Sequence, residues 1–186
     1  MGRFKLTLPW GEPTGARTVI GQVVATLETA GIAEIVVVTG YRSAEVMGAL
    51  ADTSARCVVN PDYASGAMLA SVLVGLAAVS QQCMAALLCL GDQPQMEPGV
   101  VQAILAAGQS ADWQTIIIPS YQRRAGHPIL LPRWLWGEIL AGQGTLRDVL
   151  ARHRGQTSYL TVETPTVLAD LDTPEDYETA VRLRQT

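Results

Sequence analysis

Nearly continuous apolar runs of strand length recur along the chain. The clearest are residues 34–39, 85–90 and 115–119, and shorter runs cover 56–59 and 129–131. Runs without polar alternation are typical of parallel strands that helices cover on both faces. Segments with helical spacing lie between and after them, at 18–30, 43–51, 68–81, 98–107, 132–141 and 145–154. The alternation predicts an α/β fold: a Rossmann-like, open, mostly parallel sheet flanked by helices and joined by right-handed crossovers.

A further helix is predicted from Thr173-Pro174-Glu175-Asp176. Threonine is a preferred N-cap, proline suits the first turn, and acidic residues complement the helix dipole there. No repeat, linker or low-complexity stretch interrupts the pattern. We therefore predict that residues 1–186 form one domain, which is an ordinary length for one.

Composition narrows the class of protein. The chain is 48% hydrophobic and 16% charged, which argues against disorder. Its 13 Lys and Arg against 17 Asp and Glu leave no basic excess for nucleic acid. No apolar run reaches the roughly 18 residues of a membrane span, and the first residues lack the apolar core of a secretory signal. With three cysteines and no Cys-x-x-Cys pair, the sequence predicts reduced thiols and a cytoplasmic location.

Polar and glycine residues follow several of the predicted strands. They form the segments 39–42, 60–63, 91–94 and 120–128. In open α/β sheets, ligands bind beyond the carboxyl ends of the strands. This rim of the sheet is therefore the predicted site.

Asp92 directly follows a buried apolar run and Gly91, so its carboxylate is expected at a strand exit. Mg²⁺ takes carboxylate oxygens and shares substrate phosphates, but an aspartate there can also cap a turn. Asp170 and Asp172 alternate on an extended segment, which places both carboxylates on one side. The pair could complete a metal site with Asp92, or Asp172 could help to cap the last helix.

Candidate phosphate contacts come from two other regions. Lys5 lies beside a glycine-bearing loop and could neutralise phosphate charge, or could simply be solvated. Gly66 precedes an apolar helix and permits close approach of a ligand to the backbone. Ser71, on that helix, either bonds back to its own backbone or faces the pocket.

His127 and the neighbouring Arg123 and Arg124 could contact an anionic second substrate. No cysteine or second histidine lies near His127, so a zinc site is not expected. The other histidine, His153, lies in a basic helix end and is expected to be solvated.

Six motifs in order resemble the molybdopterin nucleotidyltransferases, in particular their molybdenum cofactor cytidylyltransferase branch. The matching stretches are Met1-Gly2-x-x-Lys5-Leu6 with Leu8 to Gly11, Val36 to Tyr41, Asn60 to Gly66 with Met68 to Leu76, Leu90 to Pro94, Gly126 to Pro128, and Asp170 to Asp176. The resemblance covers nearly the whole chain.

The resemblance implies a nucleotide-diphospho-sugar transferase-like fold and transfer of CMP from CTP to a molybdopterin-type cofactor, with Mg²⁺ and release of pyrophosphate. It implies catalysis by Lys5 and Asp92, and metal binding by Asp92 with Asp170 or Asp172. The implied nucleotide contacts are Lys5, Gly40, Asn60, Gly66, Ser71 and Asp92, and the implied acceptor contacts are His127 and Arg124. A molybdoenzyme or its chaperone would receive the product. A related alternative uses GTP or another phosphate acceptor.

The family signature opens with a strand and the loop Leu-Ala-Ala-Gly-x-Ser-x-Arg, directly before the residues that match Met1-Gly2. That stretch is not in this sequence. We therefore expect the fold to lack its first strand. Either the protein starts upstream of Met1, or the chain is a truncated copy that binds a nucleotide or a partner without catalysis.

Overall fold

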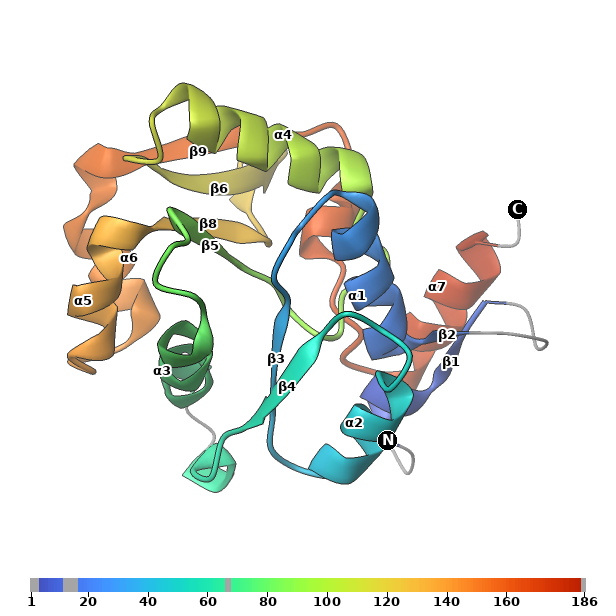
Figure 1. Cartoon of the computed structure of the whole chain (residues 1–186). Helices are drawn as coiled ribbons and strands as arrows, with labels where there is room; N and C mark the ends of the chain where they lie inside the picture. Colours follow the sequence, from blue (N-terminus) through green and yellow to red (C-terminus); the bar gives the residue numbers. More distant parts are fainter. Residues whose placement is uncertain (1–3, 12–16, 66–67, 185–186) are drawn as a thin grey trace.

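A computed structural model describes residues 4–11, 17–65 and 68–184 (Figure 1). The strands are β1 (Pro9–Trp10), β2 (Arg17–Thr18), β3 (Val36–Thr39), β4 (Arg56–Val59), β5 (Ala85–Leu88), β6 (Ile116–Tyr121), β7 (Arg124–Ala125), β8 (Ile129–Pro132) and β9 (Thr157–Thr161). The α-helices are α1 (Val19–Thr29), α2 (Ser43–Ala49), α3 (Met68–Ala78), α4 (Pro98–Ser110), α5 (Trp136–Leu140), α6 (Leu146–Arg152) and α7 (Pro174–Arg184). Short 3-10 helices are η1 (Lys5–Thr7), η2 (Tyr63–Ser65), η3 (Arg133–Leu135), η4 (Arg154–Gln156) and η5 (Pro165–Leu168). Each predicted strand and helix is present, with ends that shift by a few residues.

The main strands form two groups. Strands β3 and β4 pair in parallel. Strand β8 lies between β5 and β6 and is antiparallel to both, while β9 pairs in parallel with β6. Strands β5, β6 and β9 therefore run in one direction, and β8 and the short β7 run in the other. The α/β fold with a mostly parallel sheet is confirmed, although the sequence did not indicate the direction of β8.

Strands β3 and β5 each have a single strand neighbour among the described residues, β4 and β8 respectively. Val37 of β3 and Leu87 of β5 nevertheless pack against one apolar cluster, which is centred on α1 and includes Val24 and Leu27. The two strand groups thus share a core without pairing.

Alternate residues of β6 and β8 face opposite helical layers. Ile116 and Ile118 pack with residues of α3, α5 and α6, whereas Ile117 and Leu130 pack with residues of α4. Such alternation follows from the two-residue period of a strand. Helices on both faces explain why these strands read as continuous apolar runs.

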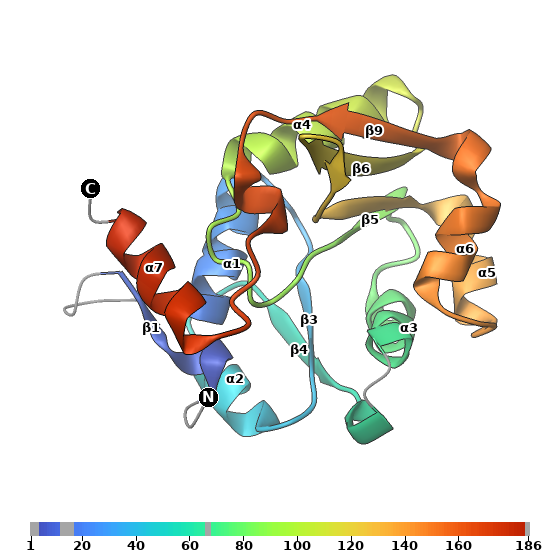
Figure 2. The same ribbon diagram turned by 180° about the vertical axis from the view of Figure 1, so that it is seen from behind.

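The last helix packs against the first hairpin, as Figures 1 and 2 show from opposite sides. Trp10 of β1 lies near Tyr177 of α7, with ring centroids 6.4 Å apart, and the Tyr177 hydroxyl donates to the Pro9 carbonyl at 2.5 Å. The predicted cap is confirmed, because Thr173 and Asp176 exchange hydrogen bonds of 2.8 and 3.1 Å. The first hairpin and the last helix of the described chain therefore lie side by side.

Two further expectations have opposite outcomes. His153 is not simply solvated: its Nε2 lies 2.6 Å from Glu138 Oε2, because α6 ends beside α5. That expectation is wrong. The three cysteines are free thiols, as expected, and burial raises the pKa of Cys89 to about 12.

Among the described residues, no helix has the length and apolar character needed to cross a membrane.

Candidate active site

Lys5 joins the exit of β5 to the segment that precedes α7. Its Nζ donates to Asp92 Oδ2 at 2.5 Å and to Asp172 Oδ1 at 3.4 Å. Helix η1 carries Lys5, and the N–H of Leu8 closes that turn by donating to the Lys5 carbonyl at 3.2 Å. Lys5 is therefore not simply solvated, and it shares its charge between two carboxylates.

The surroundings of Lys5 keep its ammonium charged. Burial disfavours the charged form, but the hydrogen bond to Asp92 and the negative charges of Asp92 and Asp172 outweigh it, so the pKa of Lys5 is raised above its ordinary value. Lys5 is thus a cation throughout the physiological pH range.

The acidic segment 170–172 has the predicted alternation. Leu171 is buried, while Asp170 and Asp172 are exposed, and the Leu171 N–H donates to the Asp92 carbonyl at 3.2 Å. The two carboxylates have different partners: Asp172 binds Lys5, and Asp170 Oδ1 accepts from Gln93 Nε2 at 2.5 Å. Asp172 makes no side-chain cap on α7, because Thr173 and Asp176 form it.

The ammonium of Lys5 therefore lies between Asp92 and Asp172, whereas Asp170 binds Gln93. Within the described ranges, no group of three His, Cys, Asp or Glu residues is arranged to hold a metal ion.

His127 lies on the loop between β7 and β8. Its backbone N–H donates to the Val167 carbonyl at 2.9 Å, and a methyl group at the preceding Gly126 would overlap that carbonyl. Burial lowers the pKa of the His127 ring, against the opposing charges of Asp170 and Asp92. The imidazole is therefore neutral at pH 7. Arg124 lies exposed on β7, three residues earlier.

A second group of predicted residues lies at the ends of β3 and β4. The side chain of Asn60 is buried, its Nδ2 donates to Ser71 Oγ at 3.1 Å, and its Oδ1 accepts from the Asp62 N–H at 2.9 Å. Ser71 thus accepts a hydrogen bond from Asn60, and Asn60 braces the loop that leads to α3. Gly40 lies against Tyr63, whose side chain a methyl group at Gly40 would overlap. Gly66 and Met1-Gly2 lie outside the described residues.

The two groups meet through Phe4, which the sequence analysis did not single out, and through Tyr41 and Arg42 of the predicted segment 39–42. Phe4, next to Lys5, packs edge-on against Tyr41 with centroids 5.8 Å apart, and the Arg42 guanidinium lies 5.4 Å from the Phe4 ring centroid. Gln93 was also missed as a separate candidate. In the sequence, Gln93 is marked only by its position between Asp92 and Pro94. The structure shows that its side chain is buried.

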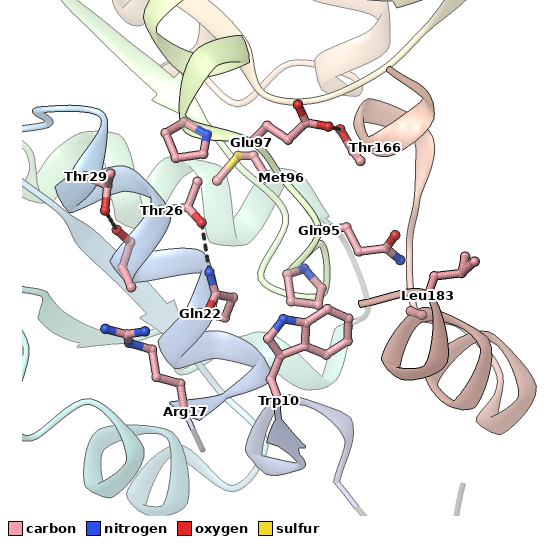
Figure 3. Close-up of a pocket in the computed structure, with 14 residues that line it drawn as sticks. Trp10, Arg17, Gln22, Thr26, Thr29, Gln95, Met96, Glu97, Thr166 and Leu183 are labelled. Atoms are coloured by element: carbon pink, nitrogen blue, oxygen red, sulfur yellow. Dashed lines mark hydrogen bonds between the residues drawn. The ribbon is translucent and has the colours of Figure 1, made fainter. Parts of the chain in front are cut away.

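A groove of about 380 Å³ lies between α1, the segment 94–98 and α7 (Figure 3). Trp10, Arg17, Gln95 and Glu97 are among its lining residues. Pro94, two residues after Asp92, lines the groove, but Lys5, Asp92, Asp170 and Asp172 do not.

Comparisons with known proteins bear on the family of the chain. The family model of the MobA-like NTP transferase domain matches residues 1–157. The molybdenum cofactor cytidylyltransferase of Escherichia coli K12 is 29% identical over 182 residues, which cover 97% of this chain and 88% of that protein.

Solved structures show the same similarity. A nucleotidyl transferase from Methanothermobacter thermautotrophicus aligns with a TM-score of 0.79 at 27% identity, over 98% of this chain and 86% of that one. The complex of Rv0371c from Mycobacterium tuberculosis H37Rv with manganese aligns with a TM-score of 0.76 at 27% identity, over 96% of this chain and 91% of that one.

Proposed function

The chain belongs to the MobA-like NTP transferase family and is a nucleotidyltransferase, and we propose that it transfers CMP from CTP to a molybdopterin-type cofactor with Mg²⁺. In this reaction a phosphate oxygen of the cofactor bonds to the α-phosphorus of CTP, and the bond to the departing pyrophosphate breaks. The similarity to the cytidylyltransferase supports the choice of nucleotide and acceptor.

The observation that carries the proposal is the ammonium of Lys5 between the carboxylates of Asp92 and Asp172. Phosphoryl and nucleotidyl transfer depend mainly on positioning and on stabilising negative charge. A charged lysine beside two carboxylates at a strand exit provides both a phosphate contact and oxygen ligands for a cation.

The carboxylates fit a hard divalent cation. Mg²⁺ in such sites takes one or two carboxylates and completes its shell with water and substrate phosphates. Asp92 and Asp172 already place their oxygens around one positive charge, that of Lys5. We propose that these two residues would hold Mg²⁺, which when bound supplies Lewis-acid stabilisation of phosphate charge. Asp170 would lie beside this pair rather than in it.

The remaining residues divide between the two substrates. Lys5, with its raised pKa, would neutralise the triphosphate. The loop braced by Asn60 and Ser71, together with Gly40 and Gly66, would lie along the nucleotide. His127, neutral at pH 7, and Arg124 would face the anionic acceptor.

We also propose one domain for residues 1–186 and a cytoplasmic location. The part beyond the family match contributes Asp170, Asp172 and all but the first residue of strand β9, which pairs with β6. These residues complete the same sheet and the same site, which supports one domain. A molybdoenzyme or its chaperone would receive the product.

The test is pyrophosphate release by the purified chain with CTP, Mg²⁺ and a molybdopterin-type cofactor. Asp92→Ala should lower the rate by about 100-fold or more, because it removes a charge-stabilising ligand. The matched control is Asp52→Ala, an exposed aspartate after α2. Unchanged release by Asp92→Ala would contradict the metal assignment.

The nucleotide is tested by competition between CTP and GTP at equal concentrations. The proposal expects incorporation of CMP to dominate. A preference for GTP would reject cytidylyl transfer and leave nucleotidyl transfer in place. No release with either nucleotide would reject the proposed activity of this chain.

A further inference from the structure

Gln93 is a buried polar side chain directly beside the proposed site. Only 2% of its surface is exposed, and it is one of the largest fully buried side chains among the described residues. An amide in an apolar interior is costly unless it is hydrogen-bonded. Its partners therefore indicate what the residue does.

The Gln93 amide bonds to the acidic segment. Its Nε2 donates to Asp170 Oδ1 at 2.5 Å and lies 3.5 Å from the Val167 carbonyl oxygen. The first bond has an ionised acceptor, and such bonds are stronger and more directional than neutral ones. One amide thus reaches the carboxylate of Asp170 and the backbone three residues before it.

The same backbone also carries the acceptor side of the site. The Val167 carbonyl accepts the N–H of His127 at 2.9 Å. Gln93 and His127 therefore share one backbone acceptor, and the Asp170 charge acts on the His127 ring. Asp170 itself is exposed and lies on an irregular segment, so in isolation its side chain would sample several rotamers.

We propose that Gln93 is a positioning residue that acts through Asp170. Gln93 holds the Asp170 carboxylate near His127 and away from Asp92 and Asp172, which bind Lys5. The charged groups that face the acceptor phosphate are thereby kept in fixed positions. This inference rests on the proposed function. Preorganised side chains hold a substrate near its reactive geometry, and loss of one supporting bond lowers the rate without removing a reacting group.

The kinetic test is a double-mutant cycle of Gln93→Met and Asp170→Ala. Methionine keeps the length and fills the space but cannot donate. Gln93→Met should lower kcat/KM for the acceptor by about tenfold, with KM for CTP changed less than about twofold. In the Asp170→Ala background, Gln93→Met should have no further effect. Gln95→Met is the control, since Gln95 lines the separate groove and should leave the rates unchanged.

The outcomes separate the two proposals. Equal losses from Gln93→Met with and without Asp170 would overturn the positioning role and leave the proposed function standing. An equal rise in KM for both substrates would also overturn it. An inert wild-type chain would overturn the proposed function, and the positioning role with it.

A second measurement leaves Gln93 in place and does not depend on turnover or on the folding of Gln93→Met. Asp170→Ala should speed hydrogen exchange of the Gln93 side-chain amide about tenfold in an NMR experiment. Asp172→Ala, which removes the neighbouring carboxylate bound to Lys5, should not. Unchanged exchange in Asp170→Ala would overturn the contact on which the inference depends.

Discussion

Strands β3 and β6 have similar apolar sequences but differ in burial. Ile116 and Ile117 of β6 are 0% and 2% exposed, whereas Val36, Val37 and Val38 of β3 are only half-buried. Strand β6 lies between β8 and β9, while β3 has β4 as its one neighbour among the described strands. An apolar run therefore indicates that a strand can be buried. The number of neighbouring strands and helices decides what fraction of its surface is buried.

The proposed site lies where the two strand groups meet. Asp92 follows β5, which pairs with the well-buried β8, and Lys5 comes from the segment that packs beside α1 and α2. Its geometry therefore depends on both regions. Five substitutions measure how different the regions are.

The largest expected effect is on the buried strand. Ile117→Ala should lower the free energy of unfolding by about 3 kcal/mol, because it leaves a cavity between β8, β9 and α4. Val37→Ala should cost about 1 kcal/mol, since its site is already partly open. Ile117→Ala removes one carbon more than Val37→Ala, and this accounts for about 1 kcal/mol of the difference between the two values. Urea denaturation measures both values, and equal losses would break the comparison.

The second effect is steric. Gly126→Ala should destabilise the protein by about 2 kcal/mol, because the new methyl group meets the rigid Val167 carbonyl. Urea denaturation again gives the value, and a neutral result would mean that the loop before His127 can shift freely.

The third effect concerns the polar contacts of Glu34, which join the start of β3 to β4 and to the segment after α3. Glu34 precedes β3; it accepts from the Ser80 N–H at 3.0 Å, just after α3, and pairs with Arg56 of β4 at 3.2 Å. The Ser80 hydrogen bond, opposed by burial and helped by Arg56 and Cys83, lowers the pKa of Glu34 below 4.5. Its stabilisation is therefore complete above the unfolded pKa and is lost as pH falls through the lowered folded pKa.

Glu34→Gln should accordingly cost about 0.5–1 kcal/mol at pH 7, a modest value because the side chain is partly exposed. The difference from wild type should shrink as the pH falls below 4.5. Thermal unfolding across pH 3–7, an interval of about four pH units, measures it. A difference independent of pH would show that the carboxylate charge has no part in the link.

The smallest effect has the opposite sign. Gly48 lies exposed in α2, and a methyl group there would have no neighbour within 4 Å. Gly48→Ala should stabilise the protein by about 0.5 kcal/mol through helix propensity alone. Loss of stability would show that the region around α2 is packed as tightly as the β6 region. The measurement is the shift in the urea midpoint at constant slope.

Much of the architecture could be predicted from the sequence, because its main strands and helices have strong periodicity. Runs such as 115–119 and caps such as Thr173 are local signals, and they are confirmed. The short hairpin β1–β2 and the polar strand β9 were missed. Strand β9 (Thr157–Thr161) has mixed exposure and forms because β6 offers it a free edge, which no local pattern reveals.

The sequence predicted candidate site residues one by one, but it did not predict how they pair. The alternation at 170–172 predicted both carboxylates on one side of the segment, and in the structure both aspartates are exposed while Leu171 is buried. Asp172 pairs with Lys5, which is 167 positions away in the sequence, and Asp170 pairs with Gln93, which is 77 positions away. Spacing along a chain carries no information about such pairs.

The contact between Lys5 and Asp172 also bears on how the protein folds. It joins residues separated by 167 positions, and α7 packs on the hairpin that follows Lys5. Contacts of such high sequence separation close a loop that spans most of the chain, and they tend to form late. During synthesis on the ribosome, Lys5 would wait for Asp172 to emerge. The appearance of nucleotide binding would then report that the segments from Lys5 to α7 have folded together.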